Sequence, residues 1–185
     1  MLEKLYHLDK KLLIYFNNLG DERFDGFWKI ITSIYTWIPL FLFFIFLFFK
    51  AYKRREALRT HLIFFFSILF VNLLVYIVKE LIMRLRPNND PSLAGLLRSI
   101  YTSHDYSFFS GHASNSFAIT TFVVLCLRFK YRWVYLFYIW PLLFCFSRMY
   151  LGVHYPSDII VGSLVGTIIG ILFYKIQIKY NKITL

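Results

Sequence analysis

Two histidines and one aspartate carry the most reactive chemistry in this 185-residue chain. His154 and Asp158 are four residues apart, so they share one face if that turn is helical. An aspartate that accepts a hydrogen bond from one imidazole nitrogen leaves the other nitrogen free to act as a nucleophile. His112 could then protonate a leaving oxygen. These three residues could instead bind a metal ion, but the cations beside them would repel it, so we favour nucleophilic chemistry.

Three cationic residues accompany this set without a matching cluster of carboxylates: Lys79, Arg86 and Arg148. Such a set suits a multiply charged anion, and the forked guanidinium group matches the paired oxygens of phosphate. Ser110 and Gly111 come directly before His112, where we expect a helix to begin. Backbone N–H groups and the helix dipole would then add to an anion site, although Ser110 could equally be a simple helix N-cap.

The segments that must position these residues are unusually apolar. Hydrophobic residues make up 58% of the chain and charged residues 17%, and the mean hydropathy is +0.57. Soluble domains have roughly 45–50% apolar and about 25% charged residues. The composition therefore excludes a disordered chain, a coiled coil and an ordinary water-soluble domain. The two cysteines provide neither a disulfide framework nor a zinc-finger spacing. We predict a membrane protein.

Five runs without charged residues are the candidate membrane spans. A run of about 20 residues crosses the ~30 Å hydrocarbon core of a bilayer, and shorter runs can be extended by polar helix ends. The runs are residues 30–49, 60–78, 113–127, 133–147 and 159–174. The prediction is one all-α, multi-pass transmembrane helix bundle over residues 1–185, with about five spanning helices. Its other parts are an N-terminal amphipathic interfacial helix and turn (1–26), an outer loop (87–109, with a short helix at 93–101) and a cytoplasmic tail (175–185).

Lysine and arginine orient these spans. The segments 50–59, 128–132 and 175–185 hold 11 of the 21 basic residues but only one of the ten acidic residues. An excess of basic residues in short loops marks the cytoplasmic side. The net charge of +11 therefore reports topology, and we expect no nucleic-acid partner. Four span ends then place Lys79, His112, Arg148 and Asp158 at the same, outer membrane face.

Three sequence motifs in this region resemble those of a known family. Residues 79–87 read KELIMRLRP, residues 110–112 read SGH, and residues 147–158 read SRMYLGVHYPSD. In this order they resemble the KxxxxxxRP, PSGH and SRxxxxxHxxxD motifs of the type-2 phosphatidic acid phosphatase superfamily. Three motifs in order are a very specific signal. The departure is Phe109, which stands where the family usually has proline.

The resemblance implies a metal-independent phosphoric ester or anhydride hydrolase that works through a phosphohistidine and uses no cofactor. His154 would be the nucleophile, Asp158 its orienting partner, and His112 the general acid and later the base. The residues that would hold the phosphoryl oxygens are Lys79, Arg86, Ser110, Gly111 and Arg148.

The resemblance also implies an enzyme of the bacterial inner membrane, and the distribution of lysine and arginine predicts that it acts at the outer face. The expected substrate is undecaprenyl diphosphate, phosphatidylglycerol phosphate or phosphatidic acid, with the 1-phosphate of lipid A as an alternative. A non-enzymatic alternative is an anion or phospholipid transporter or scaffold, although a transporter would place its charges near the membrane midplane. We interpret Arg84 and Arg98 as interface residues whose side chains reach toward water. His104 and Asp105 either act at the site or solvate the outer loop.

Overall fold

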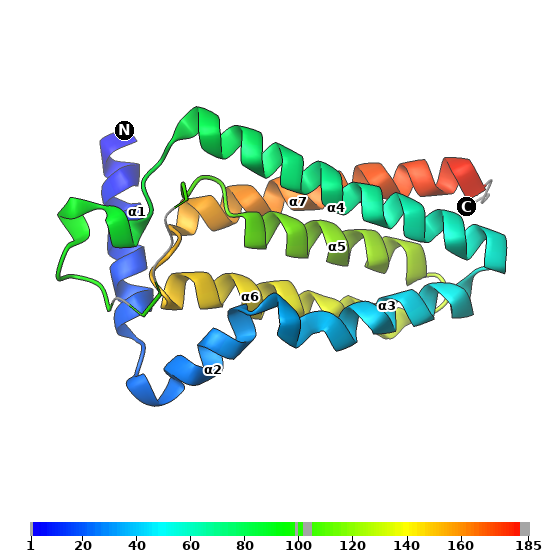
Figure 1. The fold of residues 1–185 in the computed structure, drawn as a ribbon, viewed down its shortest axis with the longest axis horizontal. Helices are drawn as coiled ribbons and strands as arrows, with labels where there is room; N and C mark the ends of the chain where they lie inside the picture. Colours follow the sequence, from blue (N-terminus) through cyan, green and yellow to red (C-terminus); the bar gives the residue numbers. More distant parts are fainter. Residues whose placement is uncertain (1, 99, 102–104, 182–185) are drawn as a thin grey trace.

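The computed structural model describes residues 2–98, 100–101 and 105–181, and this part of the chain consists of helices joined by loops, without strands (Figure 1). Its α-helices are α1 (Leu2–Asn18), α2 (Glu22–Thr32), α3 (Ile38–Ala51), α4 (Arg54–Ile82), α5 (Gly111–Leu127), α6 (Ile139–Tyr150) and α7 (Pro156–Asn181). Short 3₁₀ turns lie between them: η1 (Ile34–Trp37), η2 (Pro87–Asn89), η3 (Pro91–Leu93) and η4 (Arg132–Tyr138). The predicted all-helical fold class is confirmed.

Three helical segments of the described chain are long and apolar enough to cross a membrane. They are α3 with the η1 turn before it, α4 and α7. Many of their apolar side chains point outward; Leu73 of α4 is 58% exposed and Ile168 of α7 is 64% exposed. Outward apolar side chains all along a long helix are typical of contact with lipid. Helices α5 and α6 are shorter, so the count of five spans stays a prediction.

The first predicted span, residues 30–49, is not one helix. Helix α2 ends at Thr32, Ser33 is extended, and α3 begins only at Ile38. Proline has no backbone N–H and is favoured in a first helical turn, and Pro39 occupies that place in α3. Two side chains satisfy the carbonyls at the break. Thr36 Oγ1 donates to the Ile30 carbonyl at 2.7 Å, and Trp37 Nε1 donates to the Ile31 carbonyl at 2.8 Å.

Two predicted boundaries outside the spans are also wrong. The polar turn expected to extend to residue 26 ends at Asp21, because the Asp21 side chain accepts from the Arg23 N–H at 2.9 Å and starts α2. The short helix expected at 93–101 does not form in the described residues of that segment. The chain there makes the tight turn η3, which Asp90 caps by accepting from the Ser92 N–H.

Helix α5 is the centre of the bundle, and it packs most closely on α7. The reason is a stripe of glycines on α7, four residues apart, at Gly162, Gly166 and Gly170. A Cβ atom at Gly166 would lie only 2.2 Å from the Ser114 carbonyl oxygen of α5. Small residues at this spacing let two backbones approach, as in many membrane helix pairs. The glycine stripe thus brings the start of α7 against the start of α5.

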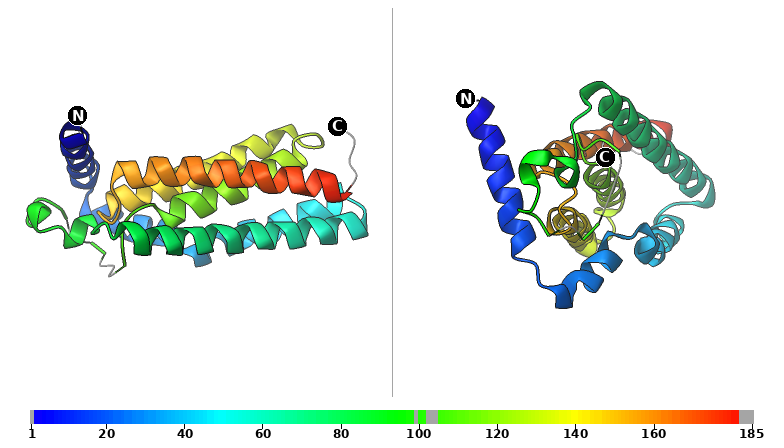
Figure 2. Two further views of the ribbon diagram at one scale, coloured as in Figure 1. Left: turned by 90° about the horizontal axis from the view of Figure 1, so that it is seen from above. Right: turned by 60° about the vertical axis from the view of Figure 1, so that its left-hand side comes forward.

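Helix α1 lies across one end of the bundle instead of along it (Figures 1 and 2). Leu13 is completely buried against the bundle, while Leu8 and Leu12 are exposed. The fully buried Asn17 holds the end of α1. Its Nδ2 donates to the Tyr150 carbonyl at 2.7 Å, and its Oδ1 accepts from the Arg98 N–H at 2.7 Å. The starts of α5 and α7 and the ends of α4 and α6 meet at this same end of the bundle.

Candidate active site

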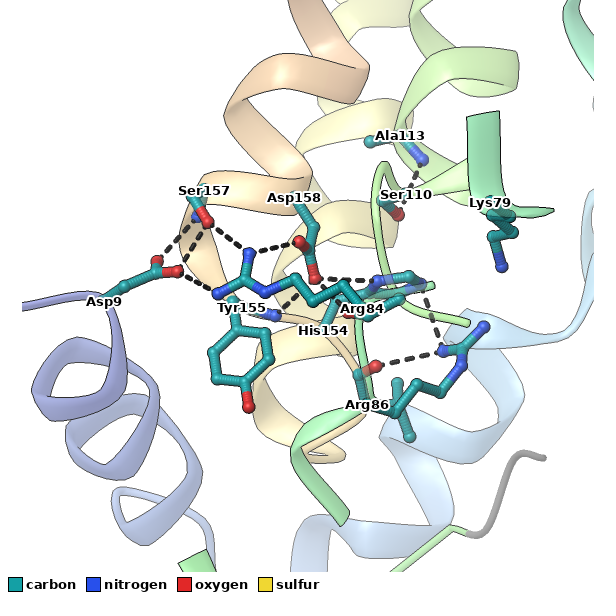
Figure 3. A network of polar contacts seen from close by, with 12 residues as sticks. Asp9, Lys79, Arg84, Arg86, Ser110, Ala113, His154, Tyr155, Ser157 and Asp158 are labelled. Atoms are coloured by element: carbon teal, nitrogen blue, oxygen red, sulfur yellow. Dashed lines mark hydrogen bonds and ion pairs between the residues drawn. The ribbon is translucent and has the colours of Figure 1, made fainter. Parts of the chain in front are cut away.

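The structure brings the residues singled out in the sequence to the end of the bundle that α1 covers. His154 lies in the connection between α6 and α7, and Asp158 lies in the first turn of α7. Ser110 donates its backbone N–H to the Asp158 carbonyl at 3.1 Å, which joins the start of α5 to the start of α7. Arg86 lies just beyond the end of α4, and its Nη1 is 3.1 Å from His154 Nε2. Figure 3 shows these groups around the imidazole.

His154 and Asp158 form a buried pair. His154 Nδ1 is 3.3 Å from Asp158 Oδ2, and both side chains are completely inaccessible to solvent. With the Nδ1 proton shared with the carboxylate, Nε2 keeps its lone pair and faces the cations. Burial lowers the pKa of His154 to about 3, and the charge of Arg86 acts in the same direction against the opposing effect of Asp158. The imidazole is therefore neutral at physiological pH.

Asp158 is held from several sides. Its Oδ2 accepts from the Tyr155 N–H at 3.0 Å and from the Ser107 hydroxyl, besides the imidazole. Its Oδ1 accepts from Arg84 Nη1 at 2.6 Å. Sequence reasoning missed Ser107 and Arg84. The interpretation of Arg84 as an interface residue is wrong, because its guanidinium points inward to two carboxylates.

The second of these carboxylates, that of Asp9 in α1, was also missed. Asp9 is 8% exposed and lies 2.7 Å from Arg84 Nη2. A signal for it was present, because Asp9 falls four residues after Leu5 and four before Leu13, on the apolar face of an amphipathic helix. An acidic residue on a face that will be buried requires a partner.

The three cations predicted to hold phosphate are all largely buried. Arg86 and Arg148 are 4% and 3% exposed, and the Lys79 side chain is 12% exposed. Arg148 Nη1 donates to Thr32 Oγ1 at 2.5 Å, while its Nε is buried without a hydrogen-bond partner in the described part of the chain. Buried guanidinium N–H groups without a partner are free to receive an oxyanion.

The loop residue Asp105 contacts two of these cations. Its carboxylate is 2.8 Å from Arg86 Nη2 and also accepts from Lys79, and its side chain is 53% exposed. Asp105 thus meets the candidate phosphate-binding groups from the solvent side instead of only solvating the loop. His104, the other loop residue considered in the sequence, lies outside the described residues.

The start of α5 combines a helix cap with a close backbone approach. Ser110 Oγ accepts from the Ala113 N–H at 3.4 Å, so the N-cap interpretation is correct for this side chain. The first N–H groups of a helix have no partner within the helix, so those of Gly111 and His112 are available to an anion. A Cβ atom at Gly111 would lie 3.2 Å from Val75 Cγ1, so a larger residue there would require Val75 to shift.

His112 lies beside an apolar cavity. Its ring packs on Phe144, with the centroids 4.9 Å apart. Burial lowers the pKa of His112, and the positive charges of Arg148, Arg86 and Lys79 act in the same direction. This cavity has a volume of about 430 Å³ and is lined by His112, Asn115 and apolar side chains of α3, α4 and α6. Among the described residues, no group of three or more His, Cys, Asp or Glu side chains is arranged to hold a metal ion.

Comparison with known proteins identifies the family. The family model of the PAP2 superfamily matches residues 60–182, about two thirds of the chain. The chain belongs to the PAP2 superfamily. The lipid A 4'-phosphatase of Bacteroides thetaiotaomicron is 31% identical over 97% of this PAP2 chain and 81% of its own length. That of Porphyromonas gingivalis is 30% identical over 96% of this chain and 76% of its own length.

A solved structure shares the fold. The PAP2-type phosphatidylglycerolphosphate phosphatase of Bacillus subtilis superposes with a TM-score of 0.74 at 22% identity, covering 95% of this chain and 87% of that one. The predicted family and the predicted enzyme class are both confirmed. The protein is a membrane PAP2 lipid phosphatase.

Proposed function

We propose that this PAP2 phosphatase removes the 4'-phosphate of lipid A. The two relatives matched over nearly the whole chain are both lipid A 4'-phosphatases, and this observation carries the substrate assignment. From sequence alone undecaprenyl diphosphate and glycerophospholipid phosphates stood first, and lipid A entered only through its 1-phosphate. The relatives favour lipid A and the other phosphate position.

His154 is proposed to be the nucleophile. Its Nε2 lone pair attacks phosphorus, a P–N bond forms, and the bond from phosphorus to the sugar oxygen breaks. His112 gives a proton to that oxygen, so a lipid alcohol leaves and a phosphohistidine remains. His112 then takes a proton from water, which attacks phosphorus and frees His154 and inorganic phosphate. The buried His154–Asp158 hydrogen bond of 3.3 Å and the neutral imidazole support this assignment.

The cations are proposed to stabilise the charge that develops on the phosphoryl oxygens. Arg86 lies 3.1 Å from the attacking nitrogen, and the unpartnered Nε of Arg148 provides a second donor. Lys79, the Ser110 hydroxyl and the Gly111 N–H complete the proposed set, since the Ser110 N–H already donates to the Asp158 carbonyl. Fixed donors in a site that excludes water are effective because they need no reorganisation during the reaction. A phosphate dianion would compete with the Asp105 carboxylate for Lys79 and Arg86.

The lipid chain is proposed to enter along the apolar cavity beside His112. This cavity is lined by apolar side chains of α3 and α4, whose outer faces are those expected to contact the bilayer. The lipid can then keep its tails in the membrane while its phosphate reaches His154. From the distribution of lysine and arginine we propose that the site faces the periplasm in the inner membrane and that the C-terminus is cytoplasmic.

The test is phosphate release by the purified protein from a panel of lipids, in detergent and in the presence of EDTA. The panel contains lipid A phosphorylated only at the 4' position, lipid A phosphorylated only at position 1, undecaprenyl diphosphate and phosphatidylglycerol phosphate. We expect lipid A phosphorylated only at the 4' position to be hydrolysed faster than the other lipids. His154→Ala should abolish activity, whereas the control His7→Ala, a change at an exposed histidine of α1, should leave activity unchanged. Preferential hydrolysis of undecaprenyl diphosphate would contradict the lipid A assignment, and an active His154→Ala protein would contradict the mechanism.

A further inference from the structure

We propose that Arg84, held in place by Asp9 of α1, is a positioning residue for the His154–Asp158 pair. Neither residue belongs to the three sequence motifs by identity, and neither is expected to touch the phosphate. The inference rests on the proposed role of His154 as nucleophile. It makes the N-terminal helix part of the catalytic apparatus.

The guanidinium of Arg84 is divided between two carboxylates (Figure 3). Its Nη1 lies 2.6 Å from Asp158 Oδ1, and its Nη2 lies 2.7 Å from Asp9 Oδ2. The guanidinium also lies over the Tyr155 ring, 3.8 Å from the centroid. Contacts on both edges and on one face leave the group a single orientation. A lysine could not reproduce this fork.

The contact with Asp158 matters because of the oxygen that it occupies. Asp158 Oδ2 is shared by the imidazole, Ser107 and the Tyr155 N–H, whereas Arg84 binds Oδ1. Without Arg84, a completely buried ionised carboxylate would keep one oxygen unpaired. The carboxylate would then rotate toward another donor or take up a proton, and either change weakens its hold on His154 Nδ1. The result is a misoriented nucleophile.

Arg84 lies on the far side of the pair from the proposed phosphate site. In Figure 3 the guanidinium groups of Arg84 and Arg86 lie on opposite sides of the His154–Asp158 pair, and Arg86 is the residue next to Nε2. Arg84 therefore acts on the attacking nitrogen only through Asp158. Its loss is expected to reduce kcat and to leave KM nearly unchanged, because an interaction that orients the nucleophile contributes little to binding of the substrate.

Asp9 fixes both Arg84 and the start of α7. Its Oδ1 accepts from the Ser157 N–H at 2.8 Å, and its Oδ2 accepts from the Ser157 hydroxyl at 2.5 Å as well as from Arg84. Pro156 has no N–H to donate, so Asp9 acts as an N-cap for α7 that comes from another helix. Docking of α1 is thereby coupled to the turn that carries Asp158.

Lys10, the neighbour of Asp9, provides a matched control. It forms an ion pair of 2.8 Å with Asp90 and also contacts Ser92, so it holds α1 to the outer loop at similar burial. It makes no contact with Arg84 or Asp158 in the described structure. Removing the Lys10 charge weakens the docking of α1 without changing the partners of the catalytic carboxylate.

The experiment measures kcat, KM and the unfolding midpoint of Arg84→Gln, Arg84→Lys, Asp9→Asn and Lys10→Gln in detergent, with the best substrate of the panel. We expect Arg84→Gln to lower kcat about 10- to 100-fold with KM changed less than about threefold, and Arg84→Lys to recover part of that loss. Asp9→Asn should lower kcat about fivefold, and Lys10→Gln less than about twofold. The Asp9→Asn, Arg84→Gln double variant should be no slower than Arg84→Gln. The asparagine oxygen can still accept from the Ser157 N–H, so the change at residue 9 acts through Arg84.

Three results would overturn the proposal. One is a kcat within twofold of the unchanged protein in Arg84→Gln. The second is a loss of kcat in Lys10→Gln as large as that in Asp9→Asn at equal loss of stability, because the role of Asp9 would then be structural alone. If Arg84→Gln does not fold, Arg84→Lys and Asp9→Asn are the variants that test the proposal. The third overturning result is an unchanged kcat in both of these variants. An active His154→Ala protein would instead contradict the proposed function.

Discussion

Replacing Gly166 by alanine is expected to separate α5 from α7 and to disturb a site two helical turns away. The new Cβ atom would lie 2.2 Å from the Ser114 carbonyl oxygen and 2.9 Å from two further backbone atoms of Ser114. Ordinary contact begins near 3.4 Å, so the helices must part by about 1 Å, because backbone atoms cannot rotate away. Ser110, one turn before Ser114, would move with α5.

The size of the effect follows from two opposing contributions. Overpacking of this kind costs about 1–3 kcal/mol, and alanine recovers roughly 0.5–1 kcal/mol through its higher helix propensity. We expect the free energy of unfolding to fall by about 1–2 kcal/mol, which lowers the unfolding midpoint by about 2–8 °C in a chain of this size. A displacement of about 1 Å between reacting groups can reduce the rate about 100-fold, so the loss of activity should exceed what the loss of stability explains.

The assay compares the unfolding midpoint and kcat of Gly166→Ala with those of Gly26→Ala in the same detergent. Gly26 is a suitable control because it also lies within a helix, α2, and a Cβ atom there would meet nothing within 4 Å. Gly26→Ala should be neutral or slightly stabilising and fully active. If Gly166→Ala matched it in both measurements, close approach of α5 and α7 would not be what assembles the site.

Three further predictions concern pH, ligands and topology. The folded pKa of His154, about 3, lies below the unfolded value of about 6.5, so its contribution to stability is complete above pH 6.5 and is lost as the pH falls toward 3. The unfolding midpoint should therefore fall as the pH falls, and His154→Gln should make that pH dependence flatter. A steeper pH dependence in His154→Gln would contradict the burial argument. Orthovanadate should compete with substrate and EDTA should leave activity unchanged; activity lost on chelation and restored by a divalent metal would exclude the metal-independent mechanism. The topology can be tested in a protein whose two buried free cysteines, Cys126 and Cys145, are replaced. A membrane-impermeant thiol reagent should label Ala94→Cys in intact spheroplasts and Arg55→Cys only after lysis, and the reverse pattern would contradict the proposed topology.

The helix ends show how far sequence patterns reach. The uncharged runs predict the helices that cross the membrane. Because successive helices run in opposite directions, successive loops between them are predicted to lie at opposite ends of the bundle. That reasoning predicts that Lys79, His112, Arg148 and Asp158 lie together, and in the structure the helix ends that carry them meet at one end of the bundle. It works because a helix in a bilayer has few alternative directions.

The errors have local causes that a count of charges cannot detect. The run at residues 30–49 contains no charged residue, yet Ser33 and Pro39 divide it, because proline favours a new helix start over a continued one. The glycines of α7 are visible in the sequence at intervals of four, but only the structure shows that α5 is the helix that packs against them. Arg84 at a helix end looks like an interface residue until its partners are seen.

The sequence by itself determined which residue types are available for chemistry, their order in three motifs, and the helix ends that carry them. These depend on local spacing and on the cost of placing charges in lipid, and both can be read along the chain. The tertiary structure alone decided which carboxylate meets which cation. Asp9 and Arg84 are 75 residues apart, and their contact depends on how α1 crosses the end of the bundle. That crossing is set by the packing of many side chains at once, and no motif encodes it.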